Sequence, residues 1–132
     1  MIAMPRFVQN IVLVLIFAGL FPTAGCVDTR ASEEARALTG GDPERGAGAI
    51  GRYGCGSCHD IPGIRNATGT VGPPLARIAR RTYLAGRVAN TPQDMMRWIQ
   101  HPQKLEPGTA MPEMNVTDGD ARDIAAYLYT LR

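Results

Sequence analysis

The sequence contains few side chains that could bind a metal ion. Its 132 residues include two histidines and three cysteines. A structural zinc site takes four ligands, usually supplied as spaced pairs. Outside the cluster at residues 55–59, only Cys26 and His101 could contribute, and neither belongs to a pair. This shortage argues against a zinc site.

The sequence also lacks a large excess of charge of either sign, and it lacks the alternating pattern of a β-strand. The formal net charge is +2 and Lys104 is the only lysine, so nothing points to nucleic acid or another polyanion as a partner. No segment shows convincing alternation of apolar and polar residues. A thioredoxin-like dithiol is therefore disfavoured, because that motif lies beside a βαβ unit. We predict an all-α fold, and the length allows one domain.

The most informative stretch is Cys55-Gly56-Ser57-Cys58-His59. Cys-x-x-Cys-His is the attachment signature of a c-type haem. The two-residue spacer brings both sulfurs to one edge of a porphyrin, and His59 then supplies an axial ligand to the iron. Fifteen glycines and ten prolines imply much loop, and a small loop-rich domain buries little surface of its own. A covalent haem would complete its core.

Residues 1–25 are typical of a signal peptide. Arg6 provides a charge near the start, residues 11–21 form an apolar run, and small residues follow at 23–25. Eleven apolar residues are too few to span a bilayer but suit a signal. A retained membrane anchor is the alternative. We therefore expect an exported protein that lies on the periplasmic or extracytoplasmic face of the membrane.

Cys26 follows a sequence that resembles a bacterial lipobox, although Thr23 stands where leucine is usual. Lipidation of Cys26 would hold the protein at a membrane; otherwise Cys26 is a stray thiol. Residues 26–41 are expected to form a polar tether, helical at most in passing over 31–38. The folded domain is expected over residues 42–132.

A side chain able to cap a helix precedes each of three segments: Asp42, Thr91 and Thr117. We expect one helix from Asp42 to about residue 53, a second from Thr91 that Pro102 stops, and a third from Thr117 to the C-terminus. A fourth short helix is expected over residues 75–81, and an extended loop over 104–115.

Several residues could supply the second axial ligand: Met95, Met96, Met111, Met114 and His101. Met95 and Met96 fall within a helix, where core packing is the simpler interpretation. Met111 precedes Pro112 in a stiff loop just before the last helix, which favours it as the ligand. Met114 is the fallback.

Residues 42–132 resemble a small bacterial class I cytochrome c. The cluster at 55–59 matches the family's haem motif, residues 72–75 match its Gly-Pro-x-Leu element, and Met111-Pro112 match its axial methionine loop. The resemblance implies that the Pro73 carbonyl accepts a hydrogen bond from the proximal imidazole. It also implies that the first and last helices cross where Gly46 meets Tyr127.

Other positions are less settled by the resemblance. Trp98 resembles a tryptophan that hydrogen-bonds a haem propionate, with core packing an equal alternative. Ile50 replaces an aromatic residue beside the helix crossing. The lysine ring of the family is missing; four arginines could replace it, pair with propionates or form a solvated face: Arg77, Arg80, Arg81 and Arg87.

The resemblance and the ligand set together imply a one-electron carrier with a single haem c. Histidine and methionine would fill both axial sites, so we expect redox proteins of a respiratory chain as partners, for example a terminal oxidase, and no small-molecule substrate. A haem peroxidase or a gas-binding sensor is possible if Met111 is displaced. Neither is favoured, because the sequence offers no acid–base pair beyond a single His101.

Overall fold

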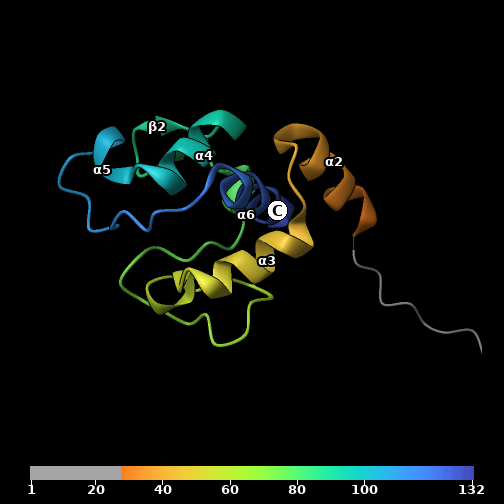
Figure 1. Cartoon of the computed structure of the whole chain (residues 1–132), viewed down its shortest axis with the longest axis horizontal. Coiled ribbons are helices and arrows are strands. Elements are labelled where there is room, and N and C mark those ends of the chain that lie inside the picture. The colour runs from red at the N-terminus through yellow and green to blue at the C-terminus, as the bar shows by residue number, and fades with distance from the viewer. Residues whose placement is uncertain (1–27) are drawn as a thin grey trace, which may run out of the picture.

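The computed structural model describes residues 28–132. The expected signal peptide at 1–25 and Cys26 lie outside them. Within the described range, none of the helices combines the length and the apolar character needed to cross a membrane. The elements are α2 (Thr29–Thr39), α3 (Pro43–Arg52), η1 (Cys55–Ser57), η2 (Ile78–Arg80), β1 (Tyr83–Leu84), β2 (Val88–Ala89), α4 (Pro92–Gln100), α5 (Pro102–Leu105) and α6 (Asp118–Thr130). The expected all-α class is confirmed (Figure 1).

The three expected helix caps are present. The Asp42 carboxylate accepts hydrogen bonds from the first backbone N–H groups of α3. Thr91 and Thr117 cap α4 and α6 in the same way, at 3.1 and 3.2 Å from the third N–H after each cap. Each cap satisfies donors that a helix leaves unpaired at its start. These helices therefore begin where the local sequence predicts.

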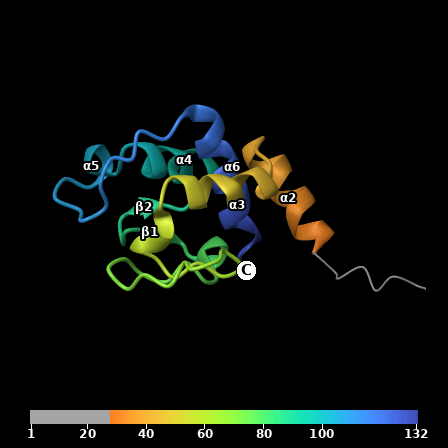
Figure 2. The ribbon, with the colours of Figure 1, turned by 60° about the horizontal axis from the view of Figure 1, so that its bottom comes forward.

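The centre of the domain is the crossing of α3 over α6 (Figure 2). At Gly46 an added Cβ would lie 2.0 Å from the Asp123 carbonyl oxygen and 3.0 Å from the Tyr127 Cβ. The two helix backbones therefore touch at the predicted glycine. Beside the crossing, Ile50 and Ile124 are almost fully buried, and α3 leads directly into η1 and the cysteines.

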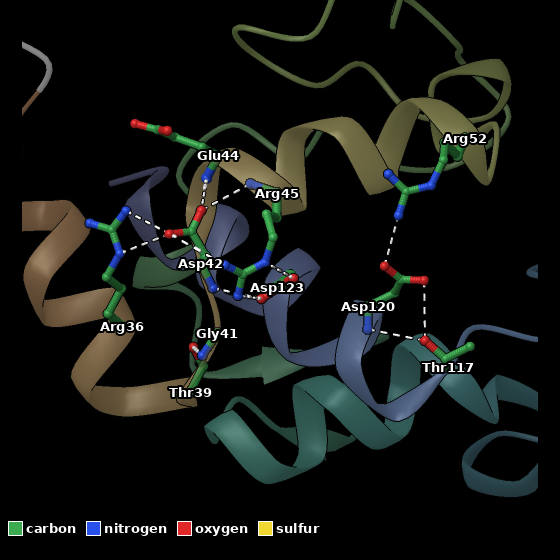
Figure 3. Close-up of polar contacts among 10 residues, drawn as sticks. All are labelled: Arg36, Thr39, Gly41, Asp42, Glu44, Arg45, Arg52, Thr117, Asp120 and Asp123. Carbon is green, nitrogen blue, oxygen red and sulfur yellow. Dashed lines mark hydrogen bonds and ion pairs between the residues drawn. The ribbon is translucent and has the colours of Figure 1, made fainter.

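Ion pairs and hydrogen bonds also join α3 to α6 at this crossing (Figure 3). Arg45 donates two hydrogen bonds to the Asp123 carboxylate, at 2.8 and 2.9 Å, and the Asp42 N–H donates a third at 2.7 Å. The hydrogen bonds from Arg45 hold the pKa of Asp123 below its ordinary value. At the other end of α3, the Arg52 guanidinium and the Tyr53 hydroxyl each donate to Asp120 at 2.8 Å.

The expected tether differs most from the structure. Residues 29–39 form α2, an ordered helix that packs against α6. Its buried residues are Ala31, Ala35 and Thr39, and Arg132 pairs with Glu34 at 2.6 Å. Alanine allows two helices to approach closely while adding little to the apolar pattern, which is why this segment resembles a polar linker in the sequence.

Three shorter segments also differ from expectation. In place of a helix over 75–81 there is only η2, because Arg77 has a left-handed backbone (φ 55°) and Arg81 is extended. Pro102 ends α4 and also begins α5, since proline is tolerated at the first helical position. Residues 83–89 form a small antiparallel hairpin in which Leu84 pairs with Val88.

Candidate haem site

The backbone after the motif fixes the orientation of His59. Its Nδ1 lies 2.8 Å from the Pro73 carbonyl oxygen. A carbonyl can only accept, so Nδ1 carries the hydrogen and Nε2 keeps a free lone pair. An added Cβ at Gly72 would lie 2.3 Å from the His59 Cε1. Glycine at 72 therefore lets the loop backbone lie directly against the imidazole.

The loop over residues 60–75 folds back beneath the two cysteines. The Gly72 N–H donates to the Cys58 carbonyl at 2.7 Å, and the Gly69 N–H donates to the Gly56 carbonyl at 3.1 Å. At Gly69 an added Cβ would approach the Cys58 backbone to 2.5 Å. The Tyr127 hydroxyl of α6 donates to the Pro62 carbonyl at 2.6 Å. The last helix thus supports the loop that supports the motif.

The side chains of Cys55 and Cys58 are half-buried. Burial raises the pKa of Cys55. Among residues 28–132 no group of three or more His, Cys, Asp or Glu side chains is placed to hold a metal ion.

The motif opens onto a cavity of about 530 Å³. Both thiols, His59 and Met111 lie on its wall, together with buried apolar side chains from α3, α4 and α6 that include Ile50, Met95 and Leu128. Two thiols beside one imidazole, in a large apolar cavity, suit a flat apolar macrocycle attached at one edge. The residues present therefore fit a haem.

Of the candidates for the second axial ligand, the cavity wall includes Met95, Met111 and Met114. Met95 is 1% exposed within α4 and forms part of the core. Met111 is half-buried and Met114 is exposed. Met96 and His101 are not on the wall. The structure thus brings Met111 and its fallback to the same cavity as His59.

Trp98 and Arg81 lie on the same wall. The Trp98 side chain is half-buried, and its indole N–H donates to no other group among the described residues. The Arg81 guanidinium donates to the carbonyls of Pro74 and Ala76. The other arginines of the cluster are off the wall, and Arg87 pairs with Glu106 at 3.8 Å.

Sequence reasoning missed two residues that shape the site. Gln103 donates to two carbonyls of the methionine loop, and Asn90 donates to the carbonyls of Ile78, the first residue of η2, and of Arg81, which follows it. Neither belongs to a recognisable motif. The available signal is only that each polar residue stands beside a segment with little regular structure.

These features define a small, mostly helical protein with a covalent haem site. The family model for cytochrome c matches residues 43–132, and the chain belongs to the cytochrome c family. It therefore carries haem c attached through Cys55 and Cys58. Helix α2 precedes the matched region.

One curated relative is a cytochrome c oxidase subunit 2 from Alkalihalophilus pseudofirmus. The two proteins are 32% identical over 79 residues, which is 59% of this chain and 22% of the relative. The chain thus corresponds to less than a quarter of that relative's length. No solved structure matches the chain.

Proposed function

We propose that this protein is a one-electron carrier whose haem iron is held between His59 and Met111. The observation that carries the proposal is that both side chains line one cavity, while the Pro73 carbonyl leaves the His59 Nε2 free to bind a metal. When bound, haem c supplies an iron that exchanges single electrons, and methionine ligation raises its reduction potential.

Residues of the chain support this role in two ways: they orient the His59 imidazole, and they line the cavity with apolar side chains. Gly72 and Pro73 hold the imidazole in one orientation and one tautomer. Apolar side chains on the cavity wall keep water from the site, and a hydrophobic shell is one of the factors that set a redox potential. Both features are consistent with an electron carrier.

The cavity wall also supports a carrier over a peroxidase. Its titratable side chains within residues 28–132 are the two thiols, His59 and Arg81. The haem bonds use the first three, and Arg81 already donates to backbone carbonyls. Peroxide cleavage needs a positioned acid–base group, and this wall does not supply one.

Redox proteins of a respiratory chain are the partners we propose, with a terminal oxidase as the acceptor. Membership of the cytochrome c family supports electron transfer, and similarity to an oxidase subunit 2 supports the respiratory setting and an extracytoplasmic location at a membrane.

The proposal includes a signal peptide over 1–25 and a lipid anchor at Cys26, with residues 42–132 as the haem domain. The lipobox-like residues 23–26 support the anchor. Asp28 already caps α2 by accepting from the Ala31 N–H at 3.2 Å. An anchor at Cys26 would therefore lie three residues before the first residue of α2, a helix that packs on the domain, and would hold the domain close to the membrane. Mass analysis of the mature protein would report cleavage, acylation and haem attachment together.

A redox titration with carbon monoxide as a competing ligand tests the proposed function. A carrier with both axial sites filled should titrate as a single one-electron centre, and its reduced form should not change its spectrum under carbon monoxide. Ready formation of an adduct would instead favour a gas sensor, and turnover of hydrogen peroxide would favour a peroxidase. Either result would contradict the proposal.

A further inference from the structure

The loop that carries Met111 has little backbone structure of its own. Between the end of α5 and the start of α6 no helix or strand is present. Within residues 107–112, the one backbone–backbone hydrogen bond joins the Thr109 N–H to the Glu106 carbonyl at 3.1 Å. The Met111 N–H reaches only the Thr109 hydroxyl, at 3.4 Å. Contacts from residues outside the loop must therefore hold the loop in place if the Met111 thioether, a weak ligand, is to bind a metal.

The side chain of Gln103 supplies that support. Its Nε2 donates to the Thr109 carbonyl at 2.6 Å and to the Met111 carbonyl at 3.0 Å. Its Oε1 accepts from the Gly108 N–H at 3.3 Å. Gly108 is left-handed (φ 86°) at the turn. One carboxamide thus contacts three residues of the loop, on both its donor and its acceptor side.

We propose that Gln103 is the positioning residue for Met111, holding the loop so that the thioether stays at the cavity. This inference rests on the proposed ligation by Met111. An amide is the group that the geometry requires, because two N–H donors face two carbonyls and one oxygen faces an N–H. Glutamate has the same shape, but its carboxylate would place negative charge against both carbonyls and lose both donors.

The matched control is Gln100, at the end of α4. Its Nε2 also makes two hydrogen bonds, to the Val116 carbonyl at 3.3 Å and to Asp118 at 2.7 Å. These contacts lie at the start of α6 and do not involve residues 108–111. Gln100→Leu therefore removes a similar number of hydrogen bonds without releasing the methionine loop.

The test measures cyanide binding to the oxidised holoprotein, because cyanide must displace the sixth ligand. Gln103→Leu and Gln103→Glu should each bind cyanide about tenfold more tightly than wild type, and should weaken the far-red absorption band of iron–methionine bonding. Tenfold corresponds to about 1.4 kcal/mol, which one or two lost hydrogen bonds can supply. Gln100→Leu should bind cyanide as wild type does, even if its thermal stability falls.

Met111→Ala separates this inference from the ligand assignment. If Met111→Ala abolishes the far-red band while both Gln103 variants bind cyanide as wild type does, the ligand is correct and the role of Gln103 is refuted. Equal effects from Gln103→Leu and Gln100→Leu would also refute it, as general destabilisation. If Met111→Ala leaves the band unchanged, the proposed ligation itself fails.

Discussion

Gly46→Ala tests the helix crossing that positions the haem motif. An added Cβ would lie 2.0 Å from the Asp123 carbonyl oxygen and 2.6 Å from the carbonyl carbon. Both are backbone atoms, so no rotation of a side chain can relieve the contact. Helix α3 would have to retreat from α6 until this separation reaches about 3.4 Å, the start of ordinary contact. That movement would loosen the core that contains the buried residues Ile50 and Ile124.

The expected magnitude follows from two opposing effects. Overpacking costs about 1–3 kcal/mol, and a backbone clash belongs at the upper end, about 3 kcal/mol. Replacing glycine by alanine within a helix returns about 1 kcal/mol, so we expect a net loss of about 2 kcal/mol. For a domain of about 100 residues this lowers the melting temperature by about 8–16 °C.

Thermal unfolding of the holoprotein, followed by circular dichroism, measures this effect. Gly48→Ala is the control in the same helix, because its added Cβ would meet only the Arg52 side chain at 3.6 Å. That variant gains the helix propensity without the clash, so its melting temperature should rise by about 4–8 °C. If both variants were equally stabilised, the close crossing at Gly46 would be refuted.

Two further predictions concern the haem ligand and acid stability. Gly72→Ala should reduce the yield of attached haem, measured as the ratio of haem to protein absorbance, because the new Cβ would lie 2.3 Å from the His59 ring; Gly119→Ala, which meets nothing within 4 Å, should not. The second prediction is loss of stability as the pH falls from about 4 to about 2. Hydrogen bonds from the Arg45 backbone N–H and from the Arg36 guanidinium lower the pKa of Asp42 from 3.8 to about 2. Hydrogen bonds from the Arg45 guanidinium lower the pKa of Asp123. Carboxylates with a depressed pKa stabilise the fold above the unfolded pKa and lose this contribution as they protonate. Acid titration of Asp42→Asn should show a shallower decline, and an unchanged profile would contradict this reasoning.

The sequence predicted those features that depend on short local patterns. Helix starts at Asp42, Thr91 and Thr117 are visible because a cap and its partner lie within three residues. The docking of α2 was not visible, because it depends on small buried residues such as Ala35 meeting a helix far away in the sequence. The left-handed backbone at Arg77 was also unpredictable from residue type, since arginine rarely adopts it.

The candidate haem site likewise combines residues that local patterns predict with residues that they do not. The haem motif and the loop at residue 72 could be found because each is a contiguous string, and the contact between His59 and Pro73 is present at 2.8 Å. Gln103 could not be found, because its role depends on where α5 places a side chain relative to a loop five to eight residues later.

The central claim is that iron is held between His59 and Met111, and the most direct measurement compares Met111→Ala with Met114→Ala. Both methionines lie on the cavity wall, so the pair isolates the identity of the ligand. Met111→Ala should lose the far-red iron–methionine band, lower the reduction potential and bind cyanide readily, while Met114→Ala should keep the wild-type spectrum. Retention of the band in Met111→Ala, or a purified wild-type protein without haem absorbance, would contradict the account.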